Sequence, residues 1–207
     1  MKKTIIALMA MAGVAMADTA SFDFKGADLN GKTDLTSIEL VDVATQFEAT
    51  ITALSGTLGY GDWTSESKTG ANYDFIKGAA INASLTLTFS NLVAGSTYDI
   101  TLVTGVPFEG QGSWNSLTTK NAYTASSLPL GQQNIAVREL TTFTVTGVTA
   151  DATGEIVFTI NNTNGSHSAS FNYASITGAV VPAVPEPTTA TLSLLALAGL
   201  AARRRRK

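Results

Sequence analysis

Short runs in which apolar and polar residues alternate strictly restrict the fold of this 207-residue chain more than any other feature. In residues 81–89 (INASLTLTF), every second residue is apolar and those between are Asn, Ser or Thr. Because the side chains of a β-strand alternate between two faces, this pattern predicts a strand with one buried and one solvated face. About nine such segments with polar turns between them predict a single all-β domain, a β-sandwich or jelly roll.

The predicted strands are residues 21–25, 38–43, 47–54, 79–89, 97–104, 142–146, 155–161 and 168–178. Two longer segments, residues 56–78 and 105–133, interrupt the alternation, and we interpret them as long loops. Long loops on a rigid β-scaffold are the usual place for binding residues.

Composition excludes several kinds of site. The chain has no Cys, so it forms no disulfide and has no thiolate nucleophile or Cys-based metal site. Seven of the 13 basic residues lie at the two ends, whereas all 16 acidic residues lie between Asp18 and Glu186. The body therefore carries about 10 excess negative charges and repels phosphate backbones, which argues against a nucleic-acid partner.

The N-terminus has the pattern of a signal peptide. Two lysines, Lys2 and Lys3, precede an apolar stretch, and Ala15 and Ala17 place small residues where a signal peptidase requires them. We predict a signal helix over residues 1–17 with cleavage after Ala17.

The C-terminus has a short apolar stretch, residues 190–202, followed by a basic cluster. At about 1.5 Å per residue the stretch covers about 20 Å, and flanking threonines and snorkelling arginines can extend it. The positive-inside rule keeps the basic cluster in the cytoplasm, so the body lies on the other side of the membrane. We predict a membrane helix here, and export of the body agrees with the signal peptide.

This tail resembles a PEP-CTERM sorting signal. Pro185-Glu186-Pro187, the apolar stretch and the terminal arginines occur in the family's order, and two prolines hold an extended segment suited to a protease cleft. The resemblance implies that an exosortase processes the tail and that the protein passes from the inner membrane to the cell surface or extracellular matrix. The alternative is a simple tail anchor with a proline linker. The implied recognition residues are Pro185, Glu186, Pro187, Arg203, Arg204, Arg205 and Arg206.

The second half of the body resembles galactose-binding-like jelly rolls. The resemblance rests on LTLTFSNLVAGSTYDITLVTG, FTVTGVTADATGEIVFTI and ASFNYASITG, which repeat that family's order of strands and turns. It implies a jelly-roll body over residues 18–181, with the sorting signal over residues 182–207. Members of this family often hold a structural Ca²⁺. Asp28, Asn30 and Asp34 alternate like part of a calcium loop, and the alternative is an ordinary turn.

Two tryptophans are candidates for glycan binding. Trp63 follows Asp62, and Trp114 precedes Asn115, both in the predicted long loops. A flat aromatic ring stacks on the C–H face of a sugar, and neighbouring Asp and Asn side chains bond its hydroxyl groups. The alternative is that each tryptophan caps one end of the core.

Catalytic motifs are missing from the sequence. The single His, His167, lies in a polar turn without a nucleophile elbow nearby. A glycosidase needs two carboxylates on either side of a sugar. Acids are available, but none forms a recognisable motif: Glu39, Asp42, Glu48, Asp62, Glu66, Asp74, Glu109 and Glu139.

We therefore predict an exported, non-enzymatic surface or matrix protein without a catalytic cofactor, whose β-sandwich binds glycans. Two alternatives remain open, a secreted glycan hydrolase that uses a carboxylate pair and a self-associating structural subunit of a matrix.

Overall fold

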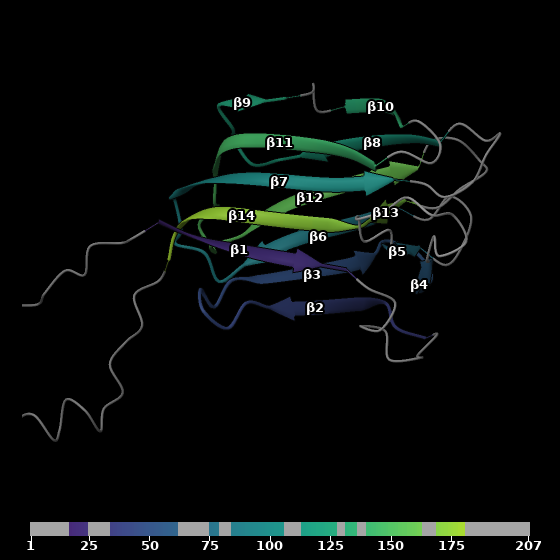
Figure 1. Cartoon of the computed structure of the whole chain (residues 1–207), viewed down its shortest axis with the longest axis horizontal. Coiled ribbons are helices and arrows are strands. Elements are labelled where there is room, and N and C mark those ends of the chain that lie inside the picture. The colour runs from purple at the N-terminus through teal and green to yellow at the C-terminus, as the bar shows by residue number, and fades with distance from the viewer. Residues whose placement is uncertain are drawn as a thin grey trace, which may run out of the picture. The chain divides into compact units, whose positions relative to one another are not determined.

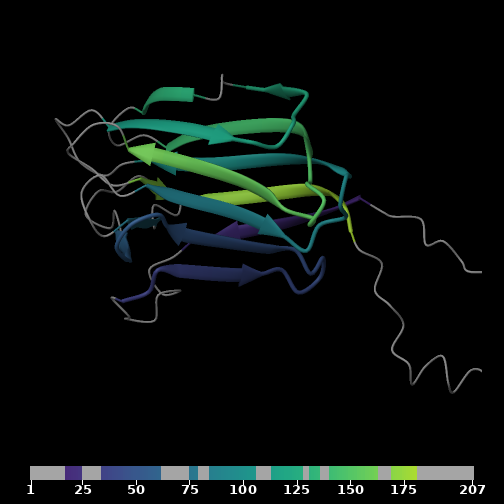
Figure 2. The same cartoon turned by 180° about the vertical axis from the view of Figure 1, so that it is seen from behind.

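The computed structural model describes residues 17–24, 34–61, 75–78, 84–105, 113–127, 131–135, 140–162 and 169–180. All of them belong to one compact unit, Val14–Val181. They form two antiparallel sheets stacked face to face, with a small third sheet at one end (Figure 1; Figure 2 from behind). Among these residues no helix is long and apolar enough to cross a membrane, and the two predicted terminal helices fall outside them except for Ala17.

The first sheet has the order β1-β14-β7-β11-β9. Its strands are Ala17–Asp23 (β1), Tyr173–Ala179 (β14), Thr97–Gly105 (β7), Leu140–Thr149 (β11) and Ala125–Ser126 (β9). The second sheet has the order β10-β8-β12-β6-β3-β2. Its strands are Gly131–Ile135 (β10), Ser113–Thr119 (β8), Ile156–Asn162 (β12), Leu85–Ser90 (β6), Glu48–Ala53 (β3) and Ser37–Val41 (β2). The small sheet joins Ser170–Phe171 (β13), Phe75–Gly78 (β5) and Leu58–Gly61 (β4).

Eight strands follow the order of a jelly roll. In chain order they are β1, β6, β7, β8, β10, β11, β12 and β14. The first sheet places the first, eighth, third and sixth of them side by side, and the second sheet places the second, seventh, fourth and fifth. This is the arrangement of two Greek keys folded into a double sheet, so the predicted jelly roll is confirmed. The β2–β3 hairpin extends the second sheet beyond β6.

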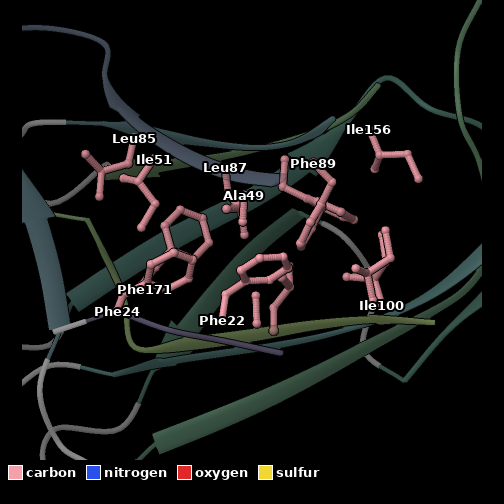
Figure 3. Packing of buried hydrophobic residues seen from close by; sticks show 14 of the residues in the cluster. Phe22, Phe24, Ala49, Ile51, Leu85, Leu87, Phe89, Ile100, Ile156 and Phe171 are labelled. Atoms are coloured by element: carbon pink, nitrogen blue, oxygen red, sulfur yellow. The ribbon is translucent and has the colours of Figure 1, made fainter. Parts of the chain in front are cut away.

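The core lies between the sheets and is built from the alternate apolar residues of their strands (Figure 3). Phe89 of β6 is fully buried, and its ring centroid lies 6.0 Å from that of Phe22 in β1 and 6.5 Å from that of Phe158 in β12. Full burial of such a side chain contributes about 1.5–3 kcal/mol. The aromatic rings therefore join the two sheets through the middle of the sandwich.

The predicted strands are confirmed where the structure describes them, apart from end residues such as Asp42 and Val43, which follow the end of β2. The last one is divided at Asn172, because β13 pairs with β5 of the small sheet whereas β14 pairs with β1 and β7. Residues 79–83 lie outside the described residues.

The interpretation of residues 56–78 and 105–133 as long loops is wrong, because they contain β4 and β5, and β8, β9 and β10. Residues 113–119 (SWNSLTT) hold one aliphatic residue, Leu117, so they show no alternation to recognise. This strand forms between β10 and β12, which offer a ladder on each side. Long-range pairing decides its structure, and local pattern does not.

Tyr98 holds the C-terminal end of β14, the last described strand. Its hydroxyl donates to Ala179 O at 2.8 Å and accepts the Val93 N–H at 2.8 Å, while its ring is buried. Gly178 packs against this ring, and a Cβ there would lie 2.3 Å from its Cδ1 atom. Burial raises the pKa of the Tyr98 hydroxyl, which therefore stays protonated and holds the last strand.

Candidate functional site

A row of hydroxyl side chains crosses the outer face of the second sheet. Strand register pairs Ser37 with Thr52, Thr52 with Thr86, Thr86 with Thr159, and Thr159 with Thr118. All five residues are half-buried or exposed, and the apolar residues next to them in the chain face the core. Adjacent strands lie about 4.8 Å apart, so this hydroxyl row spans about 19 Å over five strands.

The sequence produces this row by placing threonine at alternate strand positions. Thr is β-branched and fits a pleated, half-solvated surface, whereas the apolar residues between the threonines fill the core. A neighbouring row pairs Thr50 with Thr88 and Thr88 with Val157. Beside it, the Ser90 hydroxyl donates to Glu48 Oε2 at 2.9 Å. The face therefore combines hydroxyl groups with exposed methyl groups.

The hydroxyl groups of the row are available for a ligand. Within the part of the chain that the structure describes, no hydrogen bond joins the side chains of Thr52, Thr86, Thr159 or Thr118 to another group. Each hydroxyl therefore keeps one donor and two acceptor positions. Such a face can bond the hydroxyl groups of an extended ligand that lies across the strands.

The predicted glycan-binding residues are only partly placed. Trp114 and Asn115 lie in β8, where Trp114 pairs with Asn134 of β10 and Asn115 with Gln133. The structure thus corrects their predicted place in a loop. Asp62 and Trp63 lie outside the described residues.

A depression of about 290 Å³ lies where β8 and β11 end. It is lined by Lys120, Asn121, Ala122, Thr149, Ala150 and Asp151. The Asn121 amide donates to Thr149 O at 2.9 Å and to Glu155 O at 3.0 Å, and its Oδ1 accepts the Val157 N–H at 3.0 Å. Asn121 therefore joins the ends of β11 and β12 and has little bonding capacity left for a ligand. No sequence pattern marked this residue.

Two carboxylates hold turns. Asp42 Oδ1 accepts the Thr45 N–H at 2.8 Å, the Thr45 hydroxyl at 2.9 Å and the Ala44 N–H at 3.2 Å, and these bonds keep the pKa of Asp42 below its usual value. Asp151 Oδ1 accepts the Thr153 hydroxyl at 2.7 Å and the N–H groups of Thr153 and Glu155 at 2.9 Å each. These bonds lower the pKa of Asp151 in the same way. Both acids are thus committed to turn structure.

The predicted calcium loop is largely outside the described residues. Asp28 and Asn30 are not described, and Asp34 is exposed just before β2. Among the residues that the structure does describe, no group of three His, Asp or Glu side chains could hold a metal ion. Calcium at residues 28–34 stays a prediction.

The targeting residues lie at or beyond the limits of the described chain. Ala17 is the first residue of β1 and pairs with Ala179, so cleavage after Ala17 would leave residues 18–23 of β1 in place. Ala15, Pro185, Glu186, Pro187 and the arginines at 203–206 are outside the described residues.

The sequence of the tail matches a known family. Residues 183–207 match the PEP-CTERM protein-sorting motif. This confirms the resemblance seen in the tail, and the motif marks the chain as an exported protein. No curated protein is significantly similar to the chain.

Three solved structures are similar in fold. The CBM22-1 xylan-binding domain of Paenibacillus barcinonensis Xyn10C is 9% identical, with a TM-score of 0.43 over 70% of this chain and 94% of that one. TmCBM61 in complex with β-1,4-galactotriose is 10% identical, with a TM-score of 0.40 over 74% and 97%. The C-terminal family 22 carbohydrate-binding module of Clostridium thermocellum Xyn10B is 12% identical, with a TM-score of 0.38 over 70% and 91%.

Proposed function

We propose that this chain, an exported protein with a PEP-CTERM sorting motif at residues 183–207, is a glycan-binding component of the cell surface or extracellular matrix. In this proposal the C-terminal segment anchors it in the inner membrane until an exosortase-type enzyme processes the tail near Pro185, Glu186 and Pro187. The motif supports the sorting step, and the fold leaves the end of β14 free to continue into the tail.

The body binds its glycan through the outer face of the second sheet. The observation that carries this step is the hydroxyl row, in which Ser37, Thr52, Thr86, Thr159 and Thr118 lie in register across five strands. An extended sugar chain presents hydroxyl groups along its length, and a row of free hydroxyl and methyl groups can bond and contact it at several points.

Trp114 supplies the aromatic contact in this proposal. It lies in β8, the strand that also carries Thr118 of the hydroxyl row, and Asn115 is its neighbour in the same strand. Trp63 and Asp62 remain candidates for the same ligand.

The site is a binding site without catalysis. Asp42 and Asp151 already accept several hydrogen bonds within their turns, and Glu48 accepts one from Ser90. A glycosidase needs one carboxylate to protonate the leaving group and a second to act on the sugar. Loss of hydrolytic activity on substitution of a single acid would instead support the hydrolase alternative.

The sorting step is tested in a host that has an exosortase. Full-length chain and the variant Glu186→Ala are expressed, with Thr188→Ala as the matched control in the same segment. We expect the tail of the wild type and the control to be removed and the body to reach the surface, whereas Glu186→Ala keeps its full length in the membrane fraction. Equal processing of all three would support the simple tail anchor.

Glycan binding is tested with full-length protein in detergent on a glycan array, with and without Ca²⁺. We expect Trp114→Ala and the pair Thr86→Ala with Thr159→Ala to weaken binding at least tenfold while the variants stay folded. Thr101→Ala on the first sheet is the control and should bind as the wild type does. Loss of binding without Ca²⁺ would support the predicted calcium loop. A folded wild type that binds no glycan would overturn the glycan proposal and leave the sorting proposal intact.

A further inference from the structure

The outer edge of β2 is an open end of the second sheet. Among the described strands, β2 pairs only with β3. The Ala53 N–H donates to Thr36 O and the Asp42 N–H donates to Phe47 O, both at 2.9 Å, so the even-numbered residues of this segment bond to the β3 side. Bonded and non-bonded pairs alternate along an antiparallel ladder, so Ser37, Glu39 and Val41 turn their N–H and C=O groups away from the sheet.

Apart from the charge of Glu39, the features that usually protect such an edge are not found in β2. Natural edge strands carry proline, lysine or a bulge that prevents pairing with another chain. Ser37–Val41 (SIELV) contains neither residue, and its register with β3 is continuous. Two large apolar side chains are exposed at its end, Val41 at 48% and Val43 at 83% of their surface. Within the described residues the edge is therefore open to an added strand.

We propose that a second copy of this chain binds here, by antiparallel pairing of the two β2 strands about a two-fold axis at Glu39. When a two-fold axis relates two copies of an edge strand, the strands run antiparallel and each offers the donors and acceptors that the other needs. The same strand can therefore form both sides of the interface. In this register Ser37 lies opposite Val41, and all six outward N–H and C=O groups of each copy are bonded. The core-facing side chains of β2 are apolar, because Ile38 is buried and Leu40 packs against the core. The apolar core therefore continues across the two paired β2 strands.

The charge of Glu39 sets the strength of this pairing. The two-fold axis places the Glu39 carboxylates of the two copies opposite each other, and like charges that face each other across strands oppose pairing. The association is therefore weak in the wild type, and Glu39→Gln strengthens it. The edge strand β1 of the first sheet instead places Asp18 and Asp23 near its two ends and exposes no large apolar side chain within its described residues.

Crosslinking tests the register. The chain has no Cys, so Glu39→Cys in the full-length protein introduces the single thiol. Residues opposite each other in a bonded antiparallel pair have Cα atoms about 5.5 Å apart, which a disulfide can bridge. Under mild oxidation in detergent we expect a covalent dimer from Glu39→Cys and little from Ser21→Cys, the matched control on the β1 edge. Equal crosslinking of the two variants would overturn the proposal.

A backbone variant tests the edge itself and separates it from association through the tail. Glu39→Pro removes an outward N–H that the β2–β3 ladder does not use, so the hairpin can keep its fold. Sedimentation of full-length protein should show dimer for the wild type, at least tenfold tighter dimer for Glu39→Gln, and none for folded Glu39→Pro. Glu39→Thr is the fold control and should dimerise. A wild type that stays monomeric at all concentrations, or a Glu39→Pro variant that dimerises like it, would refute pairing through β2.

Discussion

The outer faces of the two sheets are built from the same residue types but differ in what their side chains bond. On the first sheet, register aligns Ser21, Ser175, Thr101 and Thr144 in a row like that on the second. There Ser21 Oγ accepts a hydrogen bond from the Tyr173 hydroxyl at 2.8 Å, and beside the row the hydroxyls of Thr19 and Thr177 bond to each other at 2.8 Å. Within the described chain the hydroxyl row of the second sheet makes no such bond, so the two rows differ at the β1 end. Threonine content alone therefore does not mark a binding face.

A second contrast lies in the backbone of the two faces. β11 has an irregular register between Val145 and Val148, where Asp99 Oδ1 accepts the Gly147 N–H at 2.9 Å. A bulge of this kind bends its strand and interrupts the outer rows of the first sheet. The register of β3, β6, β12 and β8 is continuous. A continuous array suits an extended ligand better than an interrupted one.

The largest expected change in the free energy of unfolding comes from substitutions in the core. It should be similar for the two sheets, because they share that core. Leu87 of β6 and Leu102 of β7 are both buried. Replacing either by Ala removes buried methyl groups and leaves a cavity, so each should lower the free energy of unfolding by about 2–5 kcal/mol. Urea unfolding of the full-length protein measures this. A loss below about 1 kcal/mol at one of them would show that its sheet contributes little to the common core.

The next effect concerns a turn of the second sheet. The unfolded pKa of an aspartate is about 3.9, and the Thr45 and Ala44 bonds lower the pKa of Asp42 in the folded state. The stabilisation is therefore complete above about pH 4 and is lost as pH falls through the folded pKa. Asp42→Ala should remove about 1 kcal/mol at pH 7 and less at pH 2. Unfolding curves at both pH values test this, and an equal loss at both would contradict it.

A smaller effect should separate the two outer faces. Tyr173→Phe removes the bond to Ser21 on the first sheet, where both residues keep contact with water. An exposed hydrogen bond of this kind contributes about 0.5 kcal/mol, at the low end of the usual range. Thermal unfolding against the wild type measures the loss. An unchanged unfolding temperature would mean that the hydroxyls of the first face are as free as those of the second.

The smallest effect on stability should accompany a loss of binding. Thr159→Val keeps the shape of a residue in the hydroxyl row whose side chain bonds to no other described group, so stability should change by less than about 0.5 kcal/mol. Thr101→Val is the matched change on the first sheet. If the second face binds glycan, only Thr159→Val weakens it on the array. Equal glycan affinity of the two variants would remove the functional difference between the faces.

Much of this molecule can be predicted where the chain alternates strictly. Residues 85–90 alternate apolar with polar residues, and residues 156–161 do so except at Val157; both became strands with their alternate apolar residues in the core. Residues 113–119 carry no such pattern, so the strand that holds Trp114 was missed. Thr52, Thr86 and Thr159 fall in predicted strands, whereas Thr118 falls in the segment interpreted as a loop. That they form one row follows from the register between strands.

The sequence by itself determined the sorting motif, the all-β class and the residues that fill the core. These depend on short segments: a Pro-Glu-Pro motif before an apolar stretch, and a period of two between neighbours in the chain. The tertiary structure alone decided which strands pair, where β8 lies and which hydroxyls are left unbonded. Those features depend on contacts between residues far apart in the sequence, such as Thr52 with Thr86 and Thr159 with Thr118. Local pattern carries no information about such pairs until the jelly roll brings their strands together.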